Sequence, residues 1–149
     1  MPTVAKVART DAGLASELRL SVMRLRRRLA AERHPDNELA SGSMAVLGWL
    51  YRTGGELTVT ELADAERVKP PSMSRTVRGL VEGGYVARRA SDDDGRQVRV
   101  SLTDRGRDTL LADRRRRDAW LALRLKELSP EERAVLRRAA PILERLATA

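Results

Sequence analysis

The 149-residue chain contains no cysteine, no phenylalanine, only four other aromatic residues and a single histidine, His34. Without cysteine it can form no disulfide, thiolate nucleophile or Cys-ligated zinc site. So few aromatic rings disfavour binding of single-stranded nucleic acid by base stacking. No apolar run reaches the roughly 18 residues needed to span a bilayer, and the N-terminal residues lack the apolar core of a signal peptide. We therefore expect a cytoplasmic protein with no membrane partner.

Positive charge exceeds negative charge, and lysine is scarce among the cations. The 29 Lys and Arg residues outnumber 21 Asp and Glu, which leaves a formal net charge of +8, and 26 of those cations are Arg. Arginine stays charged at any pH and holds phosphate through two hydrogen bonds. A genome rich in G and C would also raise the arginine content. The first partner to consider is a polyanion.

Apolar spacing and capping signals predict six helices along the chain. In the first, leucine and valine recur every three or four residues from Leu14 to Leu29, which gives one apolar stripe. Thr58 with Glu61, and Ser129 with Glu132, have the spacing of N-terminal capping boxes. The last helix contains Pro141, which predicts a kink. The predicted helices run from about Asp11 to His34, from after Ser43 to Gly54, from Thr58 to about Arg67, from Ser72 to about Glu82, from Thr103 to about Leu128, and from Ser129 onward.

Between the fourth and fifth helices, alternating residues predict a β-hairpin with strands at Tyr85–Arg89 and Arg96–Leu102, joined by a turn at Asp92–Gly95. The third and fourth helices, joined by a short turn, form a helix-turn-helix. A helix-turn-helix followed by a hairpin is a winged helix, whose second helix enters the DNA major groove. The predicted fold class is mainly α with a small β-hairpin wing.

The charge around this predicted motif favours DNA as the partner. From Arg67 to Arg89 there are six cations and one acid. Arg75, in the first turns of the fourth helix, is our candidate for reading a base, most simply guanine. The alternative is that these residues form an ordinary solvated face. The full set of predicted DNA-binding residues is Lys69, Ser72, Ser74, Arg75, Arg78, Arg88, Arg89, Asp94 and Arg96.

Two of these residues lie at the predicted hairpin tip, which is acidic. Asp94 can brace the turn and orient Arg96, two residues on, toward a phosphate or a minor groove. Alternatives are a solvated turn without a partner, or a calcium loop, for which the remaining ligands are missing. No other pattern of metal ligands is present, so we expect no metal and no cofactor.

The chain resembles the MarR family of winged-helix transcriptional repressors from about Asp11 to Ala147. The resemblance rests on three segments taken together: LTVTELA at 57–63, PSMSRTVRGLVEGGYV at 71–86 and DGRQVRVSLT at 94–103. It implies a homodimer whose terminal helices interlock, with each winged helix on half of a palindromic operator. Asp94 and Arg96 then match the family's Asp-x-Arg wing motif. Ser74 and Gly79 depart from the family's usual recognition helix.

These implications define the expected domains. Residues 1–10 form a flexible lead, residues 11–40 and 104–149 form an all-helical dimerisation lobe, and residues 41–103 form the DNA-binding lobe. The fifth helix has apolar ends and a polar waist at Asp113–Asp118, which is typical of a helix that bridges two cores. Within the waist, the run Arg114–Arg117 predicts a solvated surface. Alternatively, arginine repulsion could make the spacing of the lobes sensitive to an anion.

In this family, ligands typically enter a cleft between the two lobes. The expected effector is a small aromatic or anionic molecule, although the protein's own abundance could be the only signal. Without cysteine, peroxide sensing is excluded. Methionines and tryptophans at helical spacing are more often core residues than ligand contacts, and His34 beside Pro35 is better explained as a cap. The candidate ligand-binding residues are Arg19, Met23, Met44, Trp49 and Trp120.

The leading functional hypothesis is a ligand-responsive MarR-type regulator, a repressor that binds double-stranded DNA as a homodimer. The alternative is an architectural, nucleoid-associated DNA-binding protein without an effector. Catalysis is not expected, because one histidine, no cysteine and no phosphate-binding loop leave no catalytic set to assign.

Overall fold

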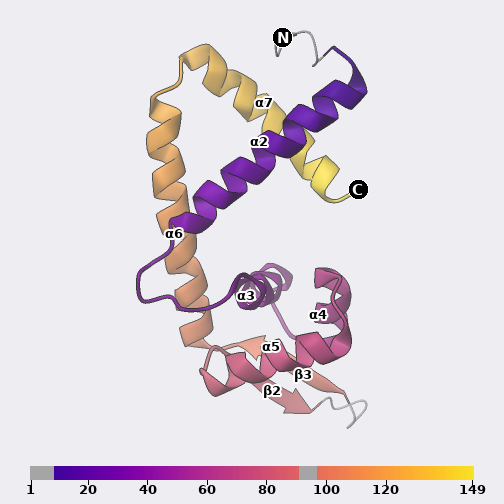
Figure 1. Cartoon of the computed structure of the whole chain (residues 1–149). Helices are drawn as coiled ribbons and strands as arrows, with labels where there is room; N and C mark the ends of the chain where they lie inside the picture. The colour runs from indigo at the N-terminus through magenta and orange to yellow at the C-terminus, as the bar shows by residue number, and fades with distance from the viewer. Residues whose placement is uncertain (1–8, 91–96) are drawn as a thin grey trace. The chain divides into compact units, whose positions relative to one another are not determined.

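The computed structural model describes residues 9–90 and 97–149. The chain forms two compact units, drawn in Figure 1. We call Met1–Arg33 together with Arg115–Ala149 the helical unit, and His34–Arg114 the winged-helix unit. One helix, α6 (Asp104–Lys126), contributes residues to both units.

The described residues form mainly helices with a small antiparallel sheet, which confirms the predicted fold class. Besides α6, the helices are α2 (Asp11–Ala31), α3 (Ser41–Thr53), α4 (Val59–Glu66), α5 (Pro70–Glu82) and α7 (Pro130–Ala147). The strands are β1 (Leu57–Thr58), β2 (Val86–Ala90) and β3 (Val98–Leu102).

Polar caps fix where several helices begin. The Thr58 hydroxyl accepts a hydrogen bond from the Glu61 amide at 3.1 Å. At α7, the Ser129 hydroxyl accepts from the Glu132 amide, and the Glu132 carboxylate accepts from the Ser129 amide at 2.8 Å, so the predicted capping box is confirmed. The predicted start of α3 was wrong. The helix begins at Ser41, because a glycine flanked by serines can be helical in a first turn whose outer amides face water.

The sheet has one strand more than the sequence predicted. Its order is β1-β3-β2, and both pairings are antiparallel. Leu57 pairs with Val100, and Val86 pairs with Leu102. With only two residues, β1 is too short to show the alternation by which a strand is recognised in sequence.

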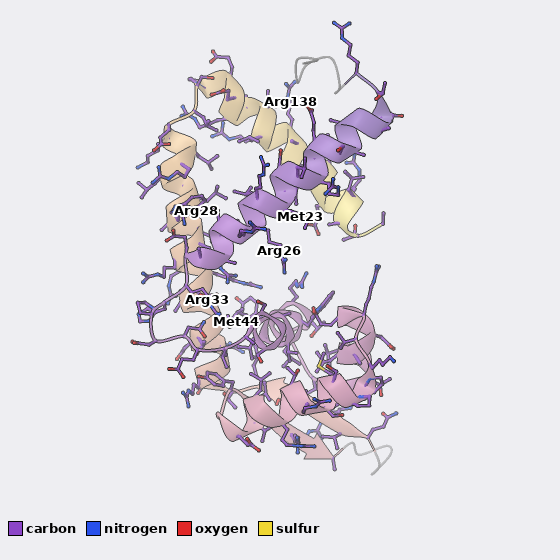
Figure 2. The ribbon with its side chains drawn as sticks, in the orientation of Figure 1. Met23, Arg26, Arg28, Arg33, Met44 and Arg138 are labelled. Atoms are coloured by element: carbon purple, nitrogen blue, oxygen red, sulfur yellow. The ribbon has the colours of Figure 1, made fainter. Side chains whose placement is uncertain are left out.

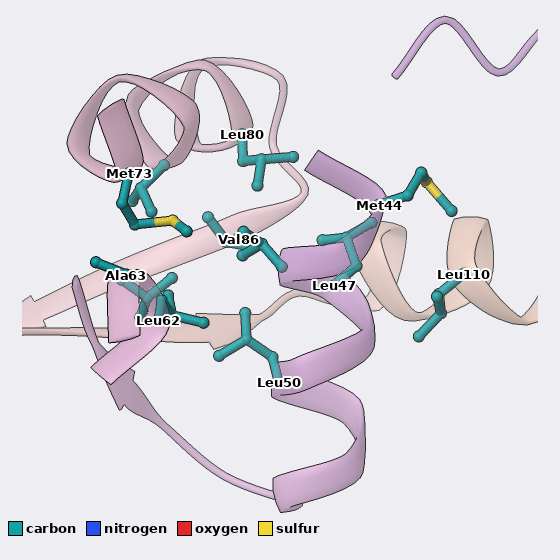
Figure 3. Packing of buried hydrophobic residues seen from close by; sticks show 12 residues of the cluster. Met44, Leu47, Leu50, Leu62, Ala63, Met73, Leu80, Val86 and Leu110 are labelled. Atoms are coloured by element: carbon teal, nitrogen blue, oxygen red, sulfur yellow. The ribbon is translucent and has the colours of Figure 1, made fainter. Parts of the chain in front are cut away.

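One hydrophobic core holds the winged-helix unit together (Figure 3). The core orients α5, because Met73, Val77 and Leu80 are buried along one side of that helix while its other side remains in solvent. Each fully buried side chain of this size contributes about 1.5–3 kcal/mol. The remaining core residues are Met44, Val46, Leu47, Leu50, Leu62, Ala63, Val86, Val100 and Leu110.

The helical unit, in contrast, leaves much apolar surface uncovered. Gly13 is the only buried residue of α2, and α7 has none among its residues. Within this unit, the Trp120 ring of α6 lies under the Arg28 guanidinium of α2, 4.8 Å from the ring centroid. Among the helices of the described part of the chain, none has the length and apolar character needed to cross a membrane. The exposed large apolar residues of this unit are Leu14, Leu20, Val22, Met23, Leu25, Leu123, Val135, Leu136, Ile142, Leu143 and Leu146.

The predicted solvated surface at Arg114–Arg117 of α6 is found only in part. Asp113 is buried, with only 1% of its surface exposed. The Arg114 guanidinium lies over the Tyr51 ring at 5.0 Å, and Arg117 is half-buried. Only Arg115 and Arg116 of the arginine run are fully exposed. An arginine can pack its stem and its flat guanidinium against other side chains, so a polar sequence does not guarantee a solvated surface.

Candidate nucleic-acid interface

Helix α5 presents a polar, positively charged face to solvent. Its buried residues, Met73, Val77 and Leu80, lie on one side, so helical geometry places Ser72, Arg75 and Arg78 on the other. Ser72, Arg75 and Arg78 are exposed and Ser74 is half-buried. This outward face is where the second helix of a helix-turn-helix meets DNA.

The cations of this face are available to a partner. Among the residues that the structure describes, Lys69, Arg75 and Arg78 make no ion pair or side-chain hydrogen bond. Lys69 immediately precedes α5, whose first two residues are Pro70 and Pro71. Prolines are suited to the first turn because they have no amide hydrogen to leave unpaired.

The turn that joins α4 to α5 is built on Arg67. Its φ of 55° lies in the left-handed region, and it is the only non-glycine residue with a positive φ in the described part of the chain. The Val68 amide donates to the Ala63 carbonyl at 3.0 Å, which closes the end of α4. This sharp reversal sets the angle at which α5 leaves α4, and therefore which face of α5 is free.

The wing strand β2 carries Arg88 and Arg89, and the structure gives them different surroundings. Adjacent strand residues project from opposite faces of a sheet. Arg89 makes two hydrogen bonds to Glu56, from Nε to Oε1 at 3.0 Å and from Nη2 to Oε2 at 2.6 Å. Arg88 is exposed and makes no comparable contact with any described residue. The charge of Arg89 is thus offset by a carboxylate, whereas that of Arg88 is not.

The same contact perturbs Glu56. The hydrogen bond from Arg89 lowers the pKa of the Glu56 carboxyl below its usual value of 4.5; partial burial opposes this shift, and the charges of Arg89 and Arg99 add to it. Glu56 is therefore ionised at neutral pH and holds Arg89 as a carboxylate. The other predicted wing residues, Asp94 and Arg96, lie outside the described residues.

The C-terminal end of α5 is fastened to the start of α6, a connection that the sequence analysis missed. Arg105 donates to the Gly83 carbonyl at 2.6 Å, and its guanidinium lies 4.4 Å from the centre of the Tyr85 ring. The Thr103 hydroxyl donates to the Gly84 carbonyl at 2.6 Å and accepts from the Gly106 amide at 3.1 Å. Thr103 was predicted as the cap of this helix, and its bond to the Gly106 amide confirms that role.

Three comparisons with known proteins agree with this geometry. The family model that matches residues 41–97 describes the MarR family. An HTH-type transcriptional regulator of Mycobacterium tuberculosis is 42% identical over 134 residues, which cover 90% of this chain and 92% of the relative. The chain belongs to the MarR family.

Solved structures of similar chains support the assignment. A transcriptional regulator protein from Pseudomonas aeruginosa superposes with a TM-score of 0.82 at 37% identity, over 93% of this chain and 96% of that one. A MarR family protein from Bacillus stearothermophilus gives a TM-score of 0.81 at 26% identity, over 95% and 97% of the two chains. The protein is therefore a transcriptional regulator of the MarR family, and its fold is the family's winged helix.

Helix α5 contains one glycine, Gly79. It lies on the outward face of α5, one turn after Arg75, and a Cβ at this position would have no atom within 4 Å. A glycine inside a helix costs about 1 kcal/mol relative to alanine. No atom of the described structure would clash with a side chain at this position. The packing of the chain therefore gives no reason for this glycine.

The five predicted ligand-binding residues divide between the two units. Arg19 and Met23 of α2 are exposed, and Trp120 of α6 is half-buried, all in the helical unit. Figure 2 labels Met23. In the winged-helix unit, Met44 belongs to the core, as the alternative reading expected, and the Trp49 indole donates to the Glu66 carboxylate at 2.5 Å. His34 was expected to cap the first helix, but α2 ends at Ala31 with Glu32 as its C-cap. The His34 ring accepts instead from the Asp36 amide in the turn that follows, at 3.1 Å.

A shallow cavity of about 260 Å³ lies within the winged-helix unit, at a place the sequence did not indicate. It is lined by residues from the end of α3, from β3 and from the start of α6, among them Leu50, Tyr51, Leu102 and Arg107. None of the predicted ligand-binding residues lines it. Within the part of the chain that the structure describes, no group of three or more potential metal ligands occurs.

Proposed function

We propose that this regulator is a repressor that binds a palindromic operator as a homodimer. The observation that carries the proposal is the outward face of α5, where Arg75 and Arg78 are exposed and lack a partner among the described residues. A pair of free guanidinium groups on the second helix of a helix-turn-helix suits the acceptor edges of guanine and the neighbouring phosphates.

Within this proposal the predicted residues take distinct roles. Arg75 reads a base in the major groove, while Lys69, Ser72, Ser74 and Arg78 contact the backbone around it. The wing residues Arg88, Arg89, Asp94 and Arg96 support a contact to the minor groove or its phosphates. Because Arg89 is already held by Glu56, we assign it a smaller share of the wing's attraction for DNA than Arg88.

Dimerisation is supported by the uncovered apolar surface of the helical unit. Along α2, the stripe contains Leu14, Val22 and Leu25, which are 44%, 48% and 44% exposed. Exposed apolar stripes on several helices of one unit are unusual for a monomer. A second copy of the chain, with the same stripes, can cover them in a two-fold interface.

A small aromatic or anionic effector would release the repressor from DNA. Solved structures of MepR from Staphylococcus aureus, at 20% identity and TM-scores of 0.67 and 0.62, contain that protein bound to an oligodeoxyribonucleotide and to ethidium bromide. The same fold therefore accommodates both kinds of partner in that protein. Of the predicted effector contacts, Arg19, Met23, Trp49 and Trp120 remain candidates, whereas Met44 is part of the core.

A gel-shift titration tests the proposal. The purified protein is titrated against the DNA that flanks its own gene, with random DNA as competitor and at several salt concentrations. The proposal predicts a complex that resists random competitor at physiological salt. Equal affinity for both DNAs, lost steeply with salt, would contradict it and favour the architectural alternative.

A further inference from the structure

The excess positive charge of the chain lies in the helical unit and not in the winged-helix unit. The helical unit contains 17 Lys and Arg residues and eight Asp and Glu, a net charge of +9. The winged-helix unit contains 12 cations and 13 acids, a net charge of −1. The basic character of the protein therefore has a source other than its recognition helix.

Within the helical unit, the charge concentrates on α2 and on the adjoining part of α6. From Leu18 to Ala31 there are five arginines and no acid, and from Arg115 to Lys126 there are five cations and one acid. Helix α7, in contrast, has four arginines and three glutamates. The contact between Arg28 and Trp120 joins the basic parts of α2 and α6. Figure 2 labels Arg26 and Arg28 in the C-terminal half of α2.

Most of these arginines have no counter-ion among the described residues. Arg28 pairs with Glu32 at 2.8 Å. Six other arginines of these two segments are exposed and make no ion pair with any residue that the structure describes. One is Arg19, near the start of the α2 segment. We call the other five the arginine cluster: Arg24, Arg26, Arg27, Arg115 and Arg116.

Dimerisation cannot neutralise this charge. A second copy adds the same +9, so the helical units of a dimer would together carry twice that charge. The apolar stripe of α2 also leaves the cluster accessible, because Arg24 and Arg27 lie on the side of the helix away from Leu18, Val22 and Leu25. Like charges at this density repel one another, and only an external anion can offset the repulsion.

We propose that the arginine cluster is a second nucleic-acid-binding surface, one that holds the phosphate backbone without reading sequence. Its charges are spread along and around two helices, which suits a chain of phosphates better than a single small anion that needs convergent donors. DNA is also the polyanion that the winged helices of the same protein are proposed to bind. The surface adds a salt-sensitive attraction and leaves operator choice to α5.

The test compares two pairs of substitutions in the full-length protein. Arg24→Gln with Arg27→Gln removes two charges from the cluster, and Arg137→Gln with Arg138→Gln removes two exposed arginines from α7 as a matched control. Binding to random duplex DNA is measured over a range of salt concentrations. We expect the cluster variant to bind more weakly and its slope of log affinity against log salt to fall by about 0.9 for each lost phosphate contact. The α7 control should retain the wild-type slope.

Equal salt slopes for the cluster variant and the wild type would overturn the inference, and so would an equal loss of affinity in the α7 control. Displacement of DNA by poly-glutamate at the same concentration of charge would also overturn it, because that result would indicate an acidic protein as the partner. The affinities of the wild type for operator and for random DNA are compared in parallel. Equal affinities would refute the proposed function but not the second surface, because the salt slope on random DNA does not depend on an operator.

Discussion

Arg89 of β2 donates two hydrogen bonds, of 3.0 and 2.6 Å, to the carboxylate of Glu56, which immediately precedes β1. A two-point contact between a guanidinium and a carboxylate fixes direction as well as distance. It fastens β2 to the segment that follows α3. Because Arg89 pairs with Arg99, at the end of β2 far from α5, the contact holds the outer part of the wing independently of the sheet's own hydrogen bonds.

This ion pair predicts a pH-dependent contribution to stability. The folded-state pKa of Glu56 is lowered, so its stabilising effect is present at pH values above the usual pKa of 4.5 and is lost as the pH falls through the folded-state value. Glu56→Gln should therefore lower the thermal unfolding midpoint more at pH 7 than near pH 3. Glu82→Gln, at an exposed residue of α5, is the control. The same deficit for Glu56→Gln at both pH values would contradict the prediction.

Two glycines predict opposite effects of the same substitution. A Cβ at Gly106 would lie 2.0 Å from the Tyr85 carbonyl oxygen, whereas a Cβ at Gly79 meets nothing within 4 Å. Gly106→Ala should lower the free energy of unfolding by about 1–3 kcal/mol or more, because backbone must move. Gly79→Ala should raise it by about 1 kcal/mol. Urea unfolding of both variants checks this, and a stable Gly106→Ala variant would show that the close approach at Tyr85 is not a constraint.

Arg75 and Arg88 should differ in what they contribute to DNA binding. Arg75→Ala should cost about 1–3 kcal/mol on the operator and relax the preference at one base pair. Arg88→Ala should weaken binding to operator and random DNA alike, because a phosphate contact carries no sequence information. Titrations against the operator and its single-base variants separate the two effects. If the preference relaxes for Arg88→Ala and not for Arg75→Ala, the two roles are reversed.

The exposed stripe of α2 predicts that a charge placed there prevents dimerisation. Leu25→Glu puts a carboxylate among apolar residues that a second copy would bury, and an unpaired buried charge is strongly unfavourable. Sedimentation equilibrium should show a monomer for Leu25→Glu and a dimer for the wild type. Ser16→Glu, on the opposite side of α2, should remain a dimer. A dimeric Leu25→Glu variant would exclude this stripe as the interface.

The sequence predicted the winged-helix architecture because its signals are local. Thr58 and Ser129 cap helices through bonds to residues three positions away, and Met73, Val77 and Leu80 reveal the buried side of α5 by their spacing. Such interactions can be recognised in a short stretch of sequence. The sequence alone therefore indicated which residues of α5 face away from the core.

Features that depend on distant residues were missed. Glu56 and Arg89 are 33 residues apart, and Arg105 reaches Gly83 across 22 residues. Asp113 lies in a polar stretch and is nevertheless buried. The need for glycine at position 106 arises mainly from the Tyr85 carbonyl, to which no sequence pattern points. Each depends on which elements pack together, information that periodicity and capping signals do not contain.

A nuclease-protection footprint on the DNA flanking the protein's own gene shows whether the protein binds a palindrome as a symmetric dimer. We expect protection of a palindrome whose half-sites lie about one helical turn apart, with contacts in successive major grooves, since two copies of α5 related by a two-fold axis must read equivalent sequences. Protection spread evenly along the DNA, or confined to a single half-site without symmetry, would contradict it.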